Sequence, residues 1–293
     1  MQRTAPGLRT NPSARLAELE RRRPEWHAWL RLLGEAEHAL DDVGWRAPLA
    51  DTEPGGTSTG SSQETPLLNG RTLRVDANRV QRLLCRLAST AAAGHLMDAA
   101  SLRRYRPSEA QAMRLLAAAV RQDLVELGAM ADVAGVDRGA LTSVAHLTAF
   151  PLLQSCGRLL EDHVPRFWPQ GYCPVCAAWP ILAERRGLDR TRRLRCGRCG
   201  GEWEVQWLCC SYCGEREHER LGSLVPEEHG DMLKVETCAS CKGYLKSFAT
   251  LQEIHPFELL LKDLETIELD LVALDRGYLR PEKNGFSLEV RLE

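Results

Sequence analysis

Four cysteine pairs of the form C-x-x-C fall within residues 173–241, and they constrain the fold more than any other feature of the chain. In each pair, two intervening residues let both thiolates face one ion while neighbouring backbone N–H groups hydrogen-bond the sulfurs. A single pair is a weak signal, because a redox dithiol has the same spacing. Two pairs together complete a tetrahedral shell. The eight cysteines are Cys173, Cys176, Cys196, Cys199, Cys210, Cys213, Cys238 and Cys241.

The order in which the pairs combine decides the architecture. A cross-braced fold joins the first pair with the third, whereas a tandem fold joins neighbouring pairs. Residues Glu202–Trp207 alternate strictly between polar and apolar side chains, which predicts a strand that leaves the first site and enters the second. Residues Arg220–Val225 and Met232–Thr237 flank a turn at Glu228–Asp231, which predicts a hairpin that returns the fourth pair to the third. We therefore predict two consecutive rubredoxin-like or zinc-ribbon modules.

Each module is predicted to hold one metal ion, iron or zinc. Zinc in a four-sulfur shell would be structural, whereas iron would add one-electron chemistry. A closed shell leaves no coordination position for water, so hydrolysis is not expected and the chain is predicted not to be an enzyme. Gly200 and Gly214 directly follow two of the pairs, but Ala177 follows the first. If the backbone there needs a positive φ, alanine costs about 1 kcal/mol, which is small beside the roughly 10–16 kcal/mol of metal-coupled folding.

The first half of the chain has the hydrophobic spacing of helices. Residues 12–45 are predicted to be helical, with Pro24 marking a break or the first turn of a new helix. Ser108 and Gln111 form a capping-box pattern ahead of another helix. Pro151 is expected to kink or divide a later one. A helical pattern also returns beyond the last cysteine pair.

These patterns predict the α+β class, with an N-terminal α-helical domain followed by the tandem four-cysteine modules and a C-terminal helix. A Gly-, Ser- and Thr-rich stretch inside the helical domain cannot bury apolar surface and is expected to be a flexible loop. The predicted parts are the helical domain at 1–170 with its loop at 51–64, the first module at 171–208, the second at 209–250, and the C-terminal helix and tail at 251–293.

Composition bears on compartment and partners. The chain has 38 basic and 40 acidic side chains and a formal charge of −2, which does not suggest a nucleic-acid or membrane partner. We expect neither export nor membrane insertion, because the sequence has no signal-like apolar core and no long apolar run. The predicted location is the cytoplasm. Its reducing conditions disfavour disulfides, so 11 cysteines point to metal instead.

Three cysteines lie outside the pairs. Cys85 and Cys156 fall in apolar helical segments and are interpreted as buried fillers. Cys209 adjoins Cys210 and could replace it as a ligand, although the spacing to Cys213 favours Cys210. The role of Cys209 stays open.

A basic run at Arg185–Arg195 keeps one alternative open, a zinc-ribbon protein that binds nucleic acid or acts in regulation. We favour a solvated hairpin that offsets thiolate charge, because Glu215–Asp231 is acidic and the whole chain is near neutral. His218 and His229 are interpreted as surface residues. No small-molecule substrate site is recognisable.

The cysteine region resembles the FdhE family. The resemblance is specific over about 170–280 and diffuse over the helical half. It rests on Gly171-Tyr172-Cys173-Pro174-Val175-Cys176, Cys196-Gly197-Arg198-Cys199 with Glu202-Trp203, Cys210-Ser211-Tyr212-Cys213-Gly214, and Glu236-Thr237-Cys238 through Cys241-Lys242-Gly243-Tyr244-Leu245-Lys246, and it continues into Asp263–Tyr278. The chain departs from the family at Ala177, where glycine is common.

The resemblance implies a cytoplasmic accessory protein that formate dehydrogenase needs to become active. It implies that the partner is the catalytic subunit of formate dehydrogenase, bound during maturation, and that the chain is not itself the dehydrogenase. It also implies that the eight paired cysteines are the ligands of two metal ions in rubredoxin-like sites, of iron or zinc.

Overall fold

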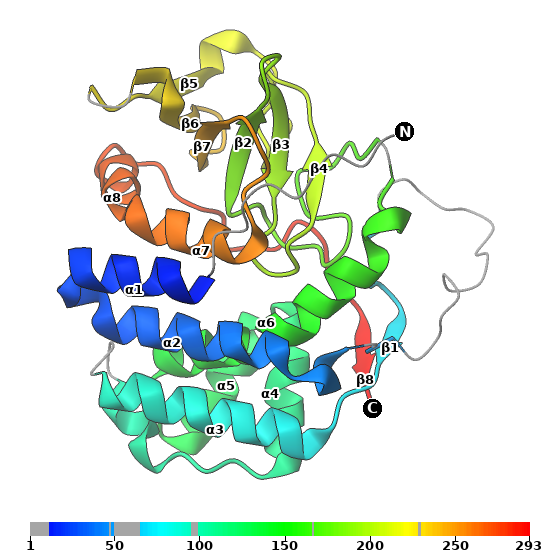
Figure 1. Cartoon of the computed structure of the whole chain (residues 1–293). Helices are drawn as coiled ribbons and strands as arrows, with labels where there is room; N and C mark the ends of the chain where they lie inside the picture. The colour runs from blue at the N-terminus through cyan, green and yellow to red at the C-terminus, as the bar shows by residue number, and fades with distance from the viewer. Residues whose placement is uncertain (1–11, 47, 50–64, 95–98, 166, 228–229) are drawn as a thin grey trace. The chain divides into compact units, whose positions relative to one another are not determined.

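The computed structural model describes residues 12–46, 48–49, 65–94, 99–165, 167–227 and 230–293 (Figure 1). The predicted loop at 51–64 lies outside the described residues. Helices and strands are both present, so the predicted α+β class is confirmed. The chain divides into two compact units, one made of residues 1–43, 77–119 and 124–151 and the other of residues 44–76, 120–123 and 152–293. The linear domain bounds given above stay a prediction.

The first unit is helical (Figure 1). Its α-helices are α1 (Pro12–Arg22), α2 (His27–His38), α3 (Ala77–Ala93), most of α4 (Glu109–Arg121), α5 (Leu124–Ala134) and the first part of α6 (Arg138–Leu160). Across both units, the described residues contain the 3-10 helices η1 (Pro24–Trp26), η2 (Ala39–Asp41), η3 (Val43–Trp45), η4 (Ala99–Arg104), η5 (Glu161–His163), η6 (His218–Arg220) and η7 (Gly230–Met232). The predicted break at Pro24 is confirmed, because η1 begins there between α1 and α2.

The capping box ahead of α4 is also confirmed. The backbone N–H of Gln111 donates to the Ser108 hydroxyl over 3.2 Å, and the Ser108 N–H donates to the Gln111 side chain over 2.8 Å. These two bonds satisfy donors that the first turn of a helix otherwise leaves without partners. A four-residue sequence pattern therefore fixes where α4 starts.

Pro151 does not divide α6, which runs unbroken from Arg138 to Leu160. Proline removes one backbone donor from a helix interior. Here the neighbours Phe150, Leu152 and Leu153 are almost fully buried, so packing holds the helix together across that position. The helix thus carries the chain from the first unit into the second, whose residues resume at Leu152.

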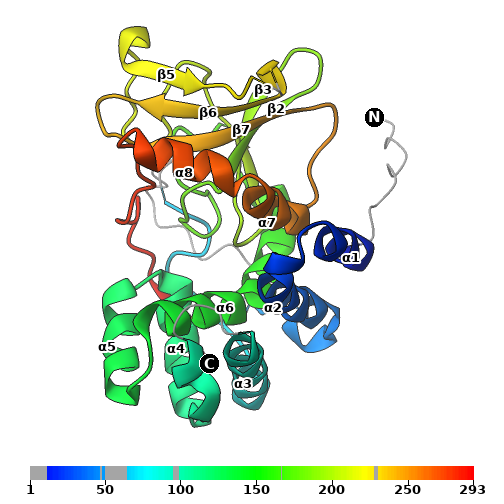
Figure 2. The same ribbon diagram turned by 90° about the vertical axis from the view of Figure 1, so that its left-hand side faces the viewer.

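The second unit contains a six-stranded sheet of order β4-β3-β2-β7-β6-β5 (Figures 1 and 2). Its strands are β2 (Leu182–Arg186), β3 (Thr191–Arg195), β4 (Glu202–Glu204), β5 (Leu221–Leu224), β6 (Leu233–Cys238) and β7 (Tyr244–Thr250). The predicted hairpin between the third and fourth cysteine pairs is confirmed by the antiparallel pairing of β5 with β6, although its turn includes residues outside those described.

The two modules share this sheet rather than forming separate ones. β2 pairs with β7 in parallel, with Ala183 opposite Ser247 and Arg186 opposite Thr250, while the other neighbours are antiparallel. Three strands come from each module, so the parallel pair is the seam between them. The sequence did not reveal this join, because strand pairing across a module boundary leaves no periodic pattern.

Two helices cover one face of the sheet, where a single C-terminal helix was expected (Figure 2). They are α7 (Pro256–Glu265) and α8 (Ile267–Asp275), with Thr266 between them. Leu259 of α7 packs with Leu182 and Phe248 of the sheet, and Ala273 of α8 packs with Val235 and Tyr244. The helical pattern was continuous in sequence, but the chain changes direction at Thr266, which has φ −112° and ψ 27°.

Two details differ from the predicted strands. β4 ends at Glu204, so the alternation through Trp207 is wrong beyond that point: Trp203 is 2% exposed and Trp207 is 43% exposed. A separate two-stranded parallel sheet was not predicted, and it pairs β1 (Arg71–Leu73) with β8 (Val290–Leu292). Within the described residues, none of the helices has the length and apolar character needed to cross a membrane.

Candidate metal centres

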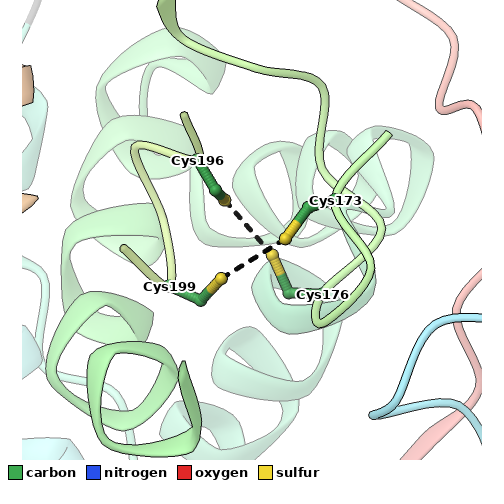
Figure 3. Close-up of side chains that lie close together, drawn as sticks. All are labelled: Cys173, Cys176, Cys196 and Cys199. Atoms are coloured by element: carbon green, nitrogen blue, oxygen red, sulfur yellow. Dashed lines mark hydrogen bonds between the residues drawn. The ribbon is translucent and has the colours of Figure 1, made fainter. Parts of the chain in front are cut away.

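The first cluster forms where two turns meet at the ends of β2 and β3. Cys173 and Cys176 lie in the turn before β2, and Cys196 and Cys199 lie in the turn after β3. Because β2 and β3 are antiparallel neighbours, both turns fall at the same edge of the sheet. The four side chains point toward one another (Figure 3), with 3.5 Å between the Cys173 and Cys199 sulfurs and between the Cys176 and Cys196 sulfurs.

The second cluster repeats this arrangement on β5 to β7. Cys210 and Cys213 precede β5, and Cys238 and Cys241 occupy the end of β6 and the turn that follows it. The Cys210 and Cys241 sulfurs are 3.7 Å apart, as are those of Cys213 and Cys238. The first pair combines with the second and the third with the fourth, so the predicted tandem grouping is confirmed and the cross-braced grouping is excluded.

Both clusters fit a tetrahedral metal ion. The sulfurs within each group all lie within 4.8 Å of one another. A tetrahedral site with metal–sulfur bonds of about 2.3 Å separates its sulfurs by about 3.8 Å, close to the distances given above. Either group could therefore hold an ion of zinc or iron, and two ions could be bound in all. That these cysteines are the metal ligands stays a prediction.

All four turns share one backbone geometry. In each, the N–H of the first cysteine donates to a carbonyl five residues later, over 2.8 to 3.0 Å: Cys173 to Ala178, Cys196 to Gly201, Cys210 to Glu215, and Cys238 to Gly243. An N–H also points at a cysteine sulfur in each turn, from Val175, Arg198, Tyr212 and Gly243, over 3.3 to 3.4 Å. Such N–H···S bonds stabilise thiolate ligands and were predicted from neighbouring backbone N–H groups; the donor lies between the two cysteines in the first three turns and after them, at Gly243, in the fourth.

The residue after each pair adopts a left-handed backbone. Its φ is 62° at Ala177, 76° at Gly200, 74° at Gly214 and 58° at Lys242. The backbone at Ala177 therefore has the positive φ on which its predicted cost depended, and Lys242 has the same strained conformation. In two of the four turns the residue in this conformation is not glycine, so those turns are less stable by the cost of placing a side chain at positive φ.

The clusters differ in burial. In the first, the exposed fraction of every cysteine is 2% or less. In the second, Cys210 and Cys238 are buried, but Cys213 and Cys241 are exposed. The sequence contains no signal for this difference, because the four turns are alike locally.

Burial of the first cluster makes four simultaneous thiolates unfavourable without a cation. Burial raises the pKa of the Cys173 thiol well above its usual range. Hydrogen bonds from Cys173, Cys176 and Cys199 hold the pKa of Cys196 well below its usual range. A divalent cation removes this penalty by binding deprotonated sulfur, which is the chemistry that this donor set fits.

Segments distant in sequence hold the first cluster from outside its module. The backbone N–H groups of Leu67 and Leu68 donate to the carbonyls of Pro174 and Val175, over 2.7 and 3.0 Å. The Gln154 side chain in α6 donates to the Arg198 carbonyl over 3.1 Å. Sequence reasoning missed these supports, because a helix and a loop give no indication of which turn they will contact.

The basic run at Arg185–Arg195 forms the predicted hairpin, in which β2 pairs antiparallel with β3, but three of its arginines are buried and not solvated as predicted. Arg195 is fully buried, where it donates to the carboxylate of Glu184, which is also fully buried, and to that of Glu253. Arg186 donates to Glu184 over 2.8 Å and to Glu202 over 2.6 Å. Burial opposes ionisation of Glu202, but the Arg186 hydrogen bond and charge outweigh it and hold the pKa of Glu202 below its usual range.

The other arginines of the run have carboxylate partners too. Their ion pairs are Arg185 with Asp231, Arg192 with Glu236, Arg190 with Asp231, and Arg193 with Glu202 and Glu204. Arg185 and Arg192 are at most 3% exposed. The run therefore crosslinks the sheet and does not present a strip of unpaired cations.

The remaining cysteines do not belong to the clusters. The Cys209 thiol donates to the Cys210 carbonyl over 3.7 Å, and Cys210 holds the position in the cluster. Cys156 is fully buried, as predicted for a filler, and burial raises its pKa to about 12. Cys85 is half-buried in α3.

The region from the second module through the C-terminal helices is similar to a known protein family. Residues 208–286 match the family described as FdhE, C-terminal domain. The chain is similar to the protein FdhE homolog of Stutzerimonas stutzeri (strain A1501), at 37% identity over 118 residues, which covers 39% of this chain and 38% of that protein. It is similar to the protein FdhE homolog of Aquifex aeolicus (strain VF5), at 29% identity over 123 residues, which covers 40% and 42% of the two chains.

These sequence matches span 38% and 42% of the length of the two curated relatives. A structural match covers far more of the chain. The crystal structure of the FdhE protein from Pseudomonas aeruginosa superposes with a TM-score of 0.58 at 24% identity, over 93% of this chain and 92% of that one, which shows a shared fold. Together the comparisons confirm the resemblance that the cysteine turns indicated.

Proposed function

We propose, from the premise that residues 208–286 belong to the FdhE C-terminal domain family, that this chain is a cytoplasmic accessory protein for formate dehydrogenase. The observation that carries the proposal is that this family region contains a complete four-cysteine cluster, Cys210, Cys213, Cys238 and Cys241. We propose that the chain binds the catalytic subunit through the region that its two metal ions stabilise.

The clusters themselves favour a binding role over a catalytic one. We propose all eight paired cysteines as metal ligands, with the four turns holding each sulfur through N–H···S bonds. Four sulfurs complete a tetrahedral shell, so no coordination position stays open for a substrate or for water. A bound ion supplies either a structural crosslink, if zinc, or one-electron chemistry, if iron.

The shared sheet explains how the metal sites could support a partner surface. The parallel pairing of β2 with β7 couples the two modules, and Glu184, which forms the buried ion pair with Arg195, is a residue of β2 in that pairing. Loss of one cluster should therefore disturb the surface of both modules. This coupling supports a role in which the modules act as one binding unit.

The nucleic-acid alternative rested on the basic run, and its arginines are paired with carboxylates. Affinity for phosphate backbones depends on cations that can replace counterions, and it falls steeply with salt. Salt-sensitive binding of DNA or RNA by the purified chain would favour this alternative over the proposed function.

The test is activation of a client. A strain that lacks its own copy of the accessory protein is complemented with the natural chain, with Cys173→Ala/Cys176→Ala, or with Cys85→Ala, and formate dehydrogenase activity is measured. We expect the double variant to abolish activation and Cys85→Ala, which removes a thiol outside both clusters, to retain it. Full activation by the double variant would overturn the proposed mechanism.

Binding is measured separately from activation. The tagged natural chain is expected to co-purify the catalytic subunit of formate dehydrogenase, and the double variant is expected to lose it. Metal content and visible absorbance of protein purified without oxygen then distinguish the ions. Two iron atoms with a reversible visible band would indicate a redox role, and two colourless zinc atoms would indicate structural centres.

A further inference from the structure

The first cluster is closed to solvent on every side. Beyond the burial of its sulfurs, its turns are packed against backbone at Gly157 and against the Ile181 side chain at Gly197, with no space for an added atom. A Cβ placed on Gly157 of α6 would be 2.0 Å from the Cys199 carbonyl oxygen, and one placed on Gly197 would be 2.8 Å from Ile181. The loop at Leu67 and Leu68 closes another side through its two backbone hydrogen bonds.

The second cluster is open at two of its four sulfurs. Cys213 and Cys241 are exposed, and each comes from a different turn. The backbone beside Cys213 is also uncovered, since a Cβ placed on Gly214 would meet nothing within 4 Å. A reagent could thus approach one ligand from each turn while Cys210 and Cys238 remain buried.

A cavity leads to these two cysteines. It has a volume of about 490 Å³ and is lined by Cys213 and Cys241 together with Trp179, Tyr212 and the segment 279–284. Its size is in the range of sites that admit small molecules, which run from about 300 to 1,000 Å³. A low-molecular-weight thiol or one arm of a chelator therefore has room to reach the sulfurs.

We propose that the second cluster is the exchangeable metal site of this chain, and that small thiolates enter it at Cys213 and Cys241. The first cluster is then a permanent centre that keeps its ion while the protein is folded. The inference rests on the proposed function in requiring that both clusters hold metal. It goes further because it assigns loading and loss of metal to the second cluster, and because it names Cys213 and Cys241 as the ligands that are displaced.

The exchange is a ligand substitution without electron transfer. As the sulfur of an incoming thiolate bonds to the ion, the bond from Cys213 or Cys241 breaks. The displaced cysteine thiolate takes up the proton that the incoming thiol released, so charge and protons balance. Access of the entering sulfur limits such a step, just as access limits thiol–disulfide exchange.

The full chain is loaded with zinc to two ions per chain, and zinc transfer to the coloured chelator 4-(2-pyridylazo)resorcinol is followed without oxygen at increasing glutathione. We expect two phases of equal amplitude, with the faster at least tenfold quicker and dependent on glutathione. Alkylation of samples taken between the phases, followed by peptide mass spectrometry, should label the four cysteines of the second cluster before those of the first.

Two variants assign the fast phase. Cys213→Ser/Cys241→Ser is expected to lose the fast ion and keep the slow one at an unchanged rate. Cys209→Ser removes a neighbouring thiol that is not in the cluster and should leave both phases as they are. A change in the fast rate in Cys209→Ser would contradict the assignment to Cys213 and Cys241.

The failures can be told apart. If the loaded chain holds two zinc ions that leave in one phase, or if the fast ion persists in Cys213→Ser/Cys241→Ser, the exchange proposal is wrong while the metal centres stand. If the folded chain binds no zinc and no iron, the metal centres of the proposed function fail and the exchange proposal fails with them.

Discussion

The α-carbon of Gly157 faces the carbonyl oxygen of Cys199 so closely that a Cβ at residue 157 would lie 2.0 Å from that oxygen. Gly157 belongs to α6, and Cys199 closes the second turn of the first cluster. A helix position that would otherwise favour alanine thus requires glycine, because the metal-site backbone occupies the space that a side chain needs.

Gly157→Ala is predicted to destabilise the protein and to loosen the first cluster. The added methyl must displace backbone, which costs about 1–3 kcal/mol in a packed interior. The free energy of unfolding is measured by urea titration, and zinc release is measured alongside it.

Gly128→Ala is the matched control, since Gly128 also lies in a helix but a Cβ there would meet its nearest atom at 3.8 Å. It should stabilise the protein by about 0.5–1 kcal/mol through helix propensity. Equal effects of the two substitutions would contradict the close approach at Gly157.

Glu184→Gln is predicted to cost about 3–5 kcal/mol of stability, because it removes the fully buried carboxylate that pairs with Arg195 and leaves only the more exposed carboxylates of Glu253 and Glu202 beside that buried cation. Glu184 also accepts hydrogen bonds from Arg186 of the first module and from the Thr250 hydroxyl of the second, so the loss reaches both modules. Urea titration monitored by circular dichroism gives the change.

The control is Asp132→Asn, which breaks an exposed pair with Arg138. Solvent screens such a pair, so its loss should leave the unfolding midpoint close to that of the natural chain. A similar small change in Glu184→Gln would show that the buried pair is not essential to the sheet.

Lys242→Gly is predicted to raise stability by about 1 kcal/mol, because it relieves a left-handed backbone that a side chain disfavours. Lys242 has a φ of 58° and is exposed, so little packing is lost. Ala177→Gly should be nearly neutral, because Ala177 is fully buried and loss of its methyl, worth about 0.8 kcal/mol, offsets the same gain. Thermal unfolding of the metal-loaded proteins compares them, and a loss of stability in Lys242→Gly would refute this account.

Cys156 is predicted to resist alkylation in the folded protein at pH 8.5, whereas Cys85 reacts. The thiolate is the reactive form of cysteine. Burial raises the pKa of Cys156 to about 12, so almost no Cys156 thiolate is present at pH 8.5. Brief treatment with N-ethylmaleimide followed by peptide mass spectrometry measures both sites. Rapid labelling of Cys156 before unfolding would show that the α6 region opens locally.

The sequence by itself determined the local chemistry of this protein. Each cysteine turn is built by hydrogen bonds among residues at most five apart, so the spacing predicted the turns themselves. The strand and hairpin patterns between the pairs then predicted the grouping of Cys173 with Cys196 and of Cys210 with Cys238. The capping box at Ser108 was predictable for the same reason.

Only the tertiary structure decided how the modules join and what each cluster exposes. The pairing of β2 with β7, the partners of the arginines at 185–195, and the closure of the first cluster by Gly157 all depend on contacts between segments far apart in sequence. Identical local turns can therefore give a sealed site at Cys199 and an open one at Cys241, because solvent access is set by what packs over a turn and not by the turn itself.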